Sequence, residues 1–499
     1  MRADRLGALW GFGIAIGLAS IHGFGGFGWA SAPSRALHGD VAAAAAEAPQ
    51  TARRAPAASP LDESDILKML ESHVSAAQIG ERARSRGIRF ALTAAVEGQL
   101  RQAGADDTLL KTLSEIQPQG LVWGPARRVA TAAEHGLVDV SNLVTETGKH
   151  YLAFTGDEKH VYVASDANGT WKIHEIYGSS NVGNGANQWY VGLVVHDGAV
   201  YVPFVTPTET GSALGVAYNT SVEGPWAHAV LFAADNPNLH DPFGTLLGDT
   251  LLVSFDMPGP RKSSDDVFVA AIPLASLPAG GAASNAPLPA QIRNVSGADD
   301  VQGGPDDGYA EMVPAEGGLD IAWQRAEKTL VFAHGEPDGS NGVTWARSPQ
   351  MLNAASDEAQ QSLQLAASGQ TVAIARFISR PNQDSGQGCC DVFATTNSSG
   401  AWATQIIGPT NMALQKPGIA VSACGPSVAF PEAMSGNSER LAVSTLEGGR
   451  WVRQLLAEDA VQPRLAATPD GLDLVYQSGY GEIFFQQAKC YPPPAPLHP

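Results

Sequence analysis

The spacing of hydrophobic residues changes twice along the chain. Residues 6–32 form one long, apolar, glycine-rich run. In residues 61–118, apolar side chains such as Ile66 and Leu70 recur at the spacing of a helix face. In the region that follows, short segments such as GIAVSACG (418–425) alternate or stay apolar and are separated by turn residues, as buried strands are. The pattern predicts a helical segment followed by a long β region.

The β region repeats itself. In its best-marked copy, GIAVSACG is followed by the strand-like segments SVAFPEAM, RLAVSTL and WVRQLLA, so that four short strands fall within about 45 residues. This is the strand content of one blade of a β-propeller. A tryptophan behind a glycine marks most copies and returns about every 50 residues, with one interval twice as long. These tryptophans are Trp123, Trp171, Trp226, Trp345, Trp402 and Trp451.

We expect six complete copies and one incomplete copy. Besides the copy above, the complete ones span residues 137–178, 188–233, 240–295, 309–352 and 361–408. The third carries a Pro/Ala/Gly insertion, which explains its missing tryptophan. The last, residues 463–488, has only three strands, and LVWGPARRVA (121–130) can supply the fourth and close the ring without an open edge. The predicted fold is mainly β: a seven-bladed β-propeller, with six blades as the alternative, preceded by a small all-α module.

The regions outside the repeat complete the predicted organisation. Residues 1–32 begin with Arg2 and Arg5 and end in small residues, which is typical of an export signal. Because the apolar run is long, an uncleaved membrane anchor through residues 6–32 is the alternative. The remaining predicted parts are an Ala/Pro linker (33–60), the helical module (61–118), the propeller (119–490) and a Pro-rich tail (491–499).

The helical segment contains its own start and stop signals. Ser75, Thr93 and Asp106 can each cap a helix, and Gly87 and Gly104 can end one. The segments RGIRFALT (86–93) and LRQAGADDTLL (100–110) resemble a short helical module that is attached to many bacterial multidomain proteins. The resemblance implies no activity. The module could serve for docking or as a structural spacer.

The turn before the recurring tryptophan also repeats. It reads Asp166…Gly-Thr-Trp171, Asn397…Gly-Ala-Trp402 and Glu447…Gly-Arg-Trp451. It resembles the Asp-box hairpin of secreted, sialidase-type propellers, with a different spacing. Since that box is structural, the resemblance implies that these tryptophans pack between blades rather than bind a ligand.

The distribution of charge along the chain limits the classes of molecule that it can bind. Only 16% of the residues are charged, yet the formal net charge is −19. Residues 119–499 hold 19 basic residues against 38 acidic ones, so the net negative charge lies on the β region. A nucleic-acid-binding surface needs a basic footprint, so we expect no nucleic-acid partner. An acidic surface favours neutral or cationic partners, or a bound cation.

Candidate chemistry gathers where the first strand of each blade begins. In a propeller these strands surround the axis, and the loops before them share one face of the ring, which we call the loop face. Asp139, Asp241 and Glu311 lie near such strand starts. Paired carboxylates could act as the acid and base of a glycoside hydrolase or hold Ca²⁺, but they could also be ordinary solvated residues.

Further candidates come from the loops. Trp189 and His240 begin or precede first strands and are expected to contribute to ligand binding. The segment FISRPNQ places Arg380 before a proline, as in sialidases, although the other arginines are too dispersed to predict a triad. The loop SGADDVQGGPDDG (296–308) could wrap a cation such as Ca²⁺ or be a solvated acidic loop. Its carboxylates are Asp299, Asp300, Asp306 and Asp307.

The four cysteines suggest two different pairings. Cys424 ends a first strand and Cys490 follows a third strand, so both should lie at the same end of neighbouring blades. A disulfide needs Cα atoms within about 7 Å, and we therefore predict the pair Cys424–Cys490. Cys389 and Cys390 are adjacent and lie toward the loop face, where they could form a vicinal disulfide beside a binding loop or remain two free thiols.

No catalytic motif stands out in the chain. The sequence favours an exported, monomeric, non-catalytic propeller, in the periplasm, the cell envelope or the medium, that binds a protein or carbohydrate ligand on its loop face. The alternative is a sialidase-like or other carbohydrate-active glycoside hydrolase. A purely structural envelope protein is a third possibility. Apart from Ca²⁺, we expect no cofactor.

Overall fold

The fold was obtained as a computed structural model of the chain. It describes residues 60–92, 94–118, 120–135, 138–156, 160–166, 169–177, 191–208, 210–234, 239–259, 264–278, 287–297, 304–326, 328–339, 342–346, 348–352, 360–379, 390–411, 416–434, 439–478 and 481–491. Within these ranges, no helix has both the length and the apolar character that a membrane crossing requires.

The N-terminal part of the described chain is a four-helix module. Its helices are α1 (Glu63–Glu71), α2 (Ala76–Arg86), α3 (Ala94–Gln102) and α4 (Asp107–Ile116). Asp62 caps α1 in a reciprocal capping box with Asp65, while the expected caps Ser75 and Asp106 accept backbone N–H groups at the starts of α2 and α4. The third expected cap, Thr93, lies outside the described residues. The apolar faces meet in one small core.

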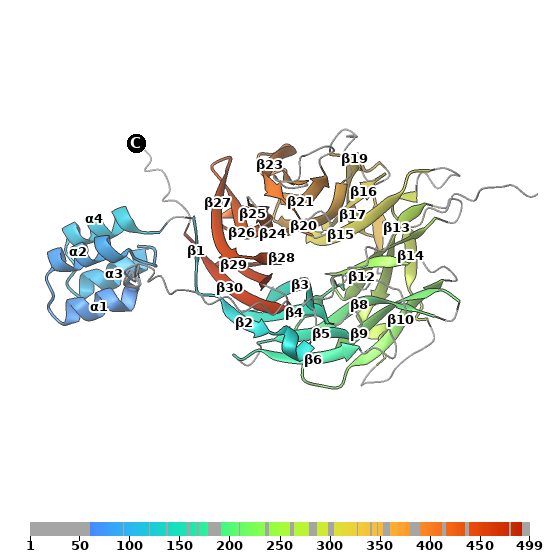
Figure 1. Ribbon diagram of the computed structural model, residues 1–499, viewed down its shortest axis with the longest axis horizontal. Helices are drawn as coiled ribbons and strands as arrows, with labels where there is room; N and C mark the ends of the chain where they lie inside the picture. The colour runs from blue at the N-terminus through green and yellow to red at the C-terminus, as the bar shows by residue number, and fades with distance from the viewer. Residues whose placement is uncertain are drawn as a thin grey trace, which may run out of the picture. The chain divides into compact units, whose positions relative to one another are not determined.

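The rest of the chain forms seven antiparallel sheets that follow one another around a ring in chain order (Figure 1). Blade 1 contains β3 (Val138–Glu146), β4 (Lys149–Gly156), β5 (His160–Ser165) and β6 (Lys172–Tyr177). Blade 2 contains β7 (Val194–His196), β8 (Ala199–Pro207), β9 (Ser212–Asn219) and β10 (Ala227–Ala234). Blade 3 contains β11 (His240–Leu247), β12 (Thr250–Pro258), β13 (Asp265–Pro273) and β14 (Gln291–Asn294), with the short helix η1 (Leu274–Ser276) after β13.

The remaining blades follow the same plan. Blade 4 contains β15 (Asp307–Ala315), β16 (Gly318–Arg325), β17 (Thr329–Pro337) and an outer strand split into β18 (Val343–Trp345) and β19 (Gln350–Met351). Blade 5 contains β20 (Gln360–Ser368), β21 (Thr371–Ser379), β22 (Cys390–Thr396) and β23 (Ala403–Thr410). Blade 6 contains β24 (Gly418–Ser422), β25 (Gly425–Ala433), β26 (Glu439–Glu447) and β27 (Arg450–Glu458).

The seventh blade closes the ring with a strand from the start of the β region. Its own strands are β28 (Ala460–Thr468), β29 (Gly471–Ser478) and β30 (Glu482–Tyr491). Two short strands, β1 (Gly120–Trp123) and β2 (Arg127–Ala130), pair antiparallel with β30, one after the other. The short helix α5 (Ala132–His135) then leads into blade 1. The predicted seven-bladed propeller and its closing segment are confirmed, and the six-bladed alternative is wrong.

The core of the ring lies between the blades. Each of its hydrophobic clusters combines buried side chains of two neighbouring blades. The recurring tryptophans take part in this packing. Trp171 of blade 1 lies 5.3 Å from Phe485 of blade 7, and Trp402 of blade 5 lies 5.1 Å from Phe332 of blade 4, measured between ring centroids. Their predicted structural role is confirmed.

One disulfide joins the last two blades. Cys424, in the turn between β24 and β25, is bonded to Cys490 of β30, and their Cα atoms lie 5.6 Å apart. The prediction of this pair is confirmed, although Cys490 lies inside the last strand rather than after it. The bond fastens the strand that carries the ring closure to blade 6.

Candidate functional site

The first strands of the blades carry a shared irregularity close to the loop face. Pairing with the second strand shifts register between His240 and Phe243 in β11, between Gly308 and Glu311 in β15, and between Val461 and Arg464 in β28. A bulge of this kind bends a strand and re-aims its side chains.

A strained residue occupies each of these three bulges. Asp241, Tyr309 and Gln462 have φ angles of 51°, 57° and 50°, in the left-handed region that residues other than glycine seldom adopt. Such backbone strain costs about 1–3 kcal/mol and concentrates at functional sites. The strained bulges thus make the loop-face ends of β11 and β15 candidate positions for a site.

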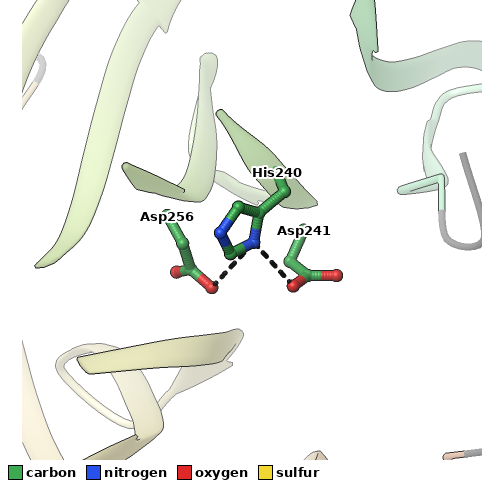
Figure 2. A group of neighbouring side chains, drawn as sticks. All are labelled: His240, Asp241 and Asp256. Atoms are coloured by element: carbon green, nitrogen blue, oxygen red, sulfur yellow. Dashed lines mark hydrogen bonds and ion pairs between the residues drawn. The ribbon is translucent and has the colours of Figure 1, made fainter. Parts of the chain in front are cut away.

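At the bulge of β11, one histidine lies among three aspartates. Figure 2 shows the imidazole of His240 between the carboxylates of Asp241 and Asp256. Its Nδ1 atom lies 2.9 Å from Oδ2 of Asp241 and 3.8 Å from Oδ2 of Asp256. On the other side of the ring, Nε2 lies 2.8 Å from Oδ2 of Asp265. We call these four residues the His240 cluster.

Strand pairing assembles the cluster. His240 begins β11 and lies directly opposite Asp256 near the end of β12, while Asp265 begins β13. The bulge then turns Asp241 toward the same imidazole. The side chains of His240, Asp265 and Asp241 are 43%, 21% and 18% exposed, whereas that of Asp256 is completely buried. The cluster thus has an accessible top and a buried floor.

Asp256 also connects blade 3 to blade 4. Its Oδ2 atom accepts a hydrogen bond of 2.7 Å from the backbone N–H of Tyr309, the strained residue of β15. A Cβ atom at the neighbouring Gly308 would lie only 3.0 Å from the same oxygen. Among the described residues, the other oxygen, Oδ1, has no hydrogen-bond partner. The floor of the cluster is therefore a buried carboxylate of which only one oxygen accepts a hydrogen bond among the described residues.

The surroundings of the cluster shift the pKa values of its groups in different directions. Burial alone would lower the pKa of His240, but its bonds to Asp241 and Asp265 outweigh this and raise the pKa to about 11. Burial acts to raise the pKa of Asp241, yet the bond to His240 lowers it overall. Burial raises the pKa of Asp256 well above its usual range, against the nearby charge of His240. Perturbed groups of this kind cluster at functional sites.

A buried ion pair lies beside the cluster. Lys416, just before β24, lies 3.0 Å from Oε1 of Glu311 in β15, and both side chains are buried. The charge of Lys416 also helps to lower the pKa of Asp241. Arg464 of β28 donates to the backbone oxygens of Lys416 and Ser141, at 2.9 and 2.8 Å. Blades 1, 4, 6 and 7 are thus tied together by charged groups that are already paired.

The three carboxylates expected from the sequence have separate partners. Asp241 belongs to the His240 cluster and Glu311 is paired with Lys416. Asp139, near the start of β3, accepts a hydrogen bond from the side chain of Gln462 in β28. Within the described part of the chain, neither Asp139 nor Glu311 belongs to a group of three metal-binding side chains.

The acidic loop is described only in part. Asp299 and Asp300 lie outside the described residues. Asp306 accepts the backbone N–H of Asp265 at 2.6 Å. Asp307 is buried and accepts hydrogen bonds from Trp323 at 3.1 Å and from Arg325 at 2.8 Å. Asp306 and Asp307 thus bind other parts of blades 3 and 4, and a cation in this loop stays a prediction.

Several other predicted site residues cannot be placed. Trp189, Arg380 and Cys389 lie outside the described residues. Cys390 begins β22, is buried and is disulfide-bonded, so the alternative of a free thiol at this position is wrong. Whether Cys390 lies beside a ligand-binding loop stays a prediction.

Asp256 and Asp265 were not anticipated from the sequence. Asp256 does carry a signal, because it interrupts the apolar run LLVSFDM, where a charged residue falls at a buried position of a strand. Only the register of β11 and β12 shows that it faces His240. Asp265 carries no comparable signal, since it belongs to the polar sequence KSSDD that precedes an apolar run.

No protein-family model matches the chain, and no curated protein matches it significantly. Solved structures give distant likenesses. An ulvan lyase of polysaccharide lyase family PL25 is 11% identical over 72% of this chain and 95% of that one, with a TM-score of 0.49. A microbial sialidase is 12% identical over 73% and 68%, with a TM-score of 0.38.

A propeller lectin also resembles the chain. The fucose-recognising, six-bladed lectin of Aleuria aurantia is 11% identical over 67% of this chain and 98% of that one, with a TM-score of 0.37. At these scores, none of the likenesses bears on the site or the activity of this chain.

Proposed function

We propose that the chain is an exported, non-catalytic propeller that binds its ligand on the loop face, at the His240 cluster between blades 3 and 4. The observation that carries this proposal is that the cluster has accessible polar groups on one side and a buried carboxylate on the other. Its accessible groups, His240 and Asp241, are already bonded to each other, while the carboxylate with the most unusual environment, Asp256, is completely buried. Such an arrangement is rigid and can hold a ligand, but the buried acid cannot reach one.

Charge and group chemistry indicate the class of ligand. The β region is strongly acidic, and the accessible oxygens of Asp241 and Asp265 are hydrogen-bond acceptors. An anionic ligand would be repelled by this face. A neutral, hydroxyl-rich ligand such as an uncharged carbohydrate can donate to these carboxylates, so we propose that class.

Export is proposed on separate grounds. The disulfide Cys424–Cys490 is of the kind that forms in oxidising compartments. The apolar run at residues 6–32, with arginines before it, supports passage out of the cytoplasm or attachment to the membrane. The propeller itself is proposed to be monomeric.

One observation favours the alternative, a glycoside hydrolase. The pKa of Asp241 is lowered while that of its neighbour Asp256 is raised, and an ionised and a protonated carboxyl side by side are what such a hydrolase uses. Against it stands the burial of Asp256 under His240. A hydrolase would need Asp256 to contact the glycosidic oxygen.

The two functions can be separated with the purified full chain. We expect binding on a glycan array without turnover of a panel of glycosides. His240→Gln and Asp241→Asn should weaken binding at least about tenfold, because each removes a polar group in a desolvated site. His334→Gln is the matched control, since His334 is 38% exposed and bonded to Asp320 on β16, away from the cluster. Turnover that Asp241→Asn abolishes would establish the hydrolase instead, and a chain without glycan binding would refute the proposal.

A further inference from the structure

We propose that His240, Asp241 and Asp256 form a binding site for one divalent transition-metal cation, such as Zn²⁺ or Mn²⁺, with Asp265 positioning the imidazole. Each residue offers one ligand atom, and the three atoms lie within 4.8 Å of one another. Ligand atoms about 2.0–2.2 Å from a shared metal lie roughly 3–4 Å apart, so small side-chain movements complete the site. The metal site stands whether or not the propeller binds a carbohydrate.

The two ring nitrogens of His240 have different surroundings. Nε2 faces one carboxylate, Asp265, at 2.8 Å, whereas Nδ1 faces two, Asp241 and Asp256. A metal ion that displaces the proton from Nδ1 would leave the other proton on Nε2, held by Asp265, and would lie between the two carboxylates that face Nδ1. Metal-binding histidines are oriented in this way, with the second nitrogen bonded to a carboxylate.

Another histidine of the same ring shows the contrast. His150 also bonds two carboxylates, but Asp166 faces Nδ1 at 2.7 Å and Asp473 faces Nε2 at 3.2 Å. The two carboxylates lie on opposite sides of the imidazole and cannot share one ion. Among the described residues, the His240 cluster contains the one group of three metal-binding side chains within 4.8 Å.

Asp256 supplies a second observation that points to a cation. Its side chain is completely buried, and its Oδ1 atom has no hydrogen-bond partner among the described residues. Burying a carboxylate oxygen without a partner is costly, because the oxygen loses its water and gains nothing. A cation that contacts this carboxylate offsets the cost.

The charge balance points the same way. Asp241, Asp256 and Asp265 together carry three carboxyl groups against the single imidazole of His240. Lys416, whose charge also acts on Asp241, is engaged with Glu311 at 3.0 Å. A bound divalent cation would stabilise the ionised forms of these carboxyl groups, including the buried Asp256, and so offset the cost of placing them together.

The donor set selects the type of metal. An imidazole with two carboxylates suits zinc, manganese and iron, whereas Ca²⁺ prefers six to eight oxygen ligands. His240 is 43% exposed, so three protein ligands leave room for water or a ligand group on the accessible side. The site is of the open kind that can bring an outside molecule into contact with the metal.

The test is calorimetric titration of the full chain, freed of metal by dialysis against a chelator, with ZnCl₂, MnCl₂ and CaCl₂ in separate experiments. We expect one site per chain for Zn²⁺ or Mn²⁺, and weaker binding of Ca²⁺. His240→Gln and Asp256→Asn should abolish that site. Asp265→Asn should weaken binding by about 10–100-fold, the usual effect of losing a group that orients a metal ligand. His334→Gln, which changes a histidine with one carboxylate partner, should leave binding unchanged.

Two controls make the result decisive. Circular dichroism and the melting temperature of each metal-free variant show whether the ring is intact. Binding of Co²⁺ to the metal-free protein should produce a visible absorption band that His240→Gln removes. A chain that binds no divalent transition metal, or a site that persists unchanged in both His240→Gln and Asp256→Asn, would refute the proposal. Either result would leave glycan binding to be judged by its own assay.

Discussion

His150 is held between carboxylates that belong to different blades. It lies on β4 of blade 1 and contacts Asp166, which follows β5, and Asp473 on β29 of blade 7. The backbone of β4 takes part as well, because the N–H of His150 donates to Asp166 at 2.9 Å. A single imidazole thus helps to hold the first and last blades together.

The first prediction concerns the charge of His150. Burial lowers its pKa, but the two carboxylates outweigh this and raise it from 6.5 to about 9. The stabilisation is therefore complete below pH 6.5 and is lost as the pH rises through 9. We expect the folded state to lose about 1–2 kcal/mol between pH 6 and 10, allowing for solvent screening. Denaturant unfolding measures it, and His150→Gln should lack this pH-dependent component. Equal pH dependence in both proteins would contradict the assignment.

The second prediction concerns Glu439 at the start of β26. Burial, with a smaller contribution from the charge of Asp459, raises its pKa from 4.5 to about 7. The contribution of Glu439 to stability is therefore most favourable below pH 4.5 and is lost as the pH rises through 7. Glu439→Gln should be about 1–2 kcal/mol more stable than the parent at pH 8 and should gain much less at pH 5. Thermal unfolding at both values checks this, and an equal gain at the two pH values would be the contrary result.

For single residues, the sequence predicted where the site carboxylates lie better than it predicted which side chains they bind. Asp139, Asp241 and Glu311 were found because apolar runs mark where first strands begin. Their partners Gln462, His240 and Lys416 depend on pairing across and between blades. Asp256 joins the site through a bulge and a strand register, which no local pattern records.

Strands were predictable where long apolar runs dominate. β12, β16 and β25 each bury seven consecutive residues, and packing of neighbouring blades fixes them. The outer strands are set by pairing instead. In blade 4 the outer strand is split into β18 and β19, which both pair with β17. The hydrophobic pattern does not predict this split, because these short strands bury few side chains.

The third prediction tests a glycine at the start of second strands. A Cβ atom at Gly471 of β29 would collide with the backbone oxygen of Ala488, and one at Gly318 of β16 would collide with that of Gly335. Since a backbone oxygen in a sheet cannot move aside, Gly471→Ala should destabilise the fold by roughly 1–3 kcal/mol.

The matched control for Gly471→Ala is Gly98→Ala. Gly98 lies within α3, and a Cβ atom there would have no neighbour within 4 Å. This change should stabilise the helix by roughly 0.5–1 kcal/mol, because alanine restricts the unfolded chain. Urea unfolding of both variants gives the comparison. A Gly471→Ala protein as stable as the parent would show that blade 7 can repack.

On the scale of the whole molecule, the fold is a ring whose ends must be held. The chain closes it by returning β1 and β2 to β30, so that strand pairing joins segments more than 350 residues apart. The blade repeat and the three-stranded last copy made this closure predictable from the sequence. The His240 cluster was harder to predict, because it depends on contacts between the strands of blade 3 and the backbone of blade 4.

The disulfide Cys424–Cys490 reinforces this closure, and the fourth prediction concerns its removal. The bond links residues 66 apart in sequence and anchors β30, which also holds β1 and β2. Cross-linking restricts the unfolded chain, so Cys424→Ser/Cys490→Ser should lose about 2–4 kcal/mol of stability. The loss should appear first at the closure, as faster hydrogen exchange in residues 120–123 and 482–491 than in blades 2 to 4. A reducing agent should reproduce the faster exchange of these residues in the parent and should not increase it further in the double variant. Uniformly faster exchange around the ring would mean that the bond stabilises the molecule as a whole, with no special role at the closure.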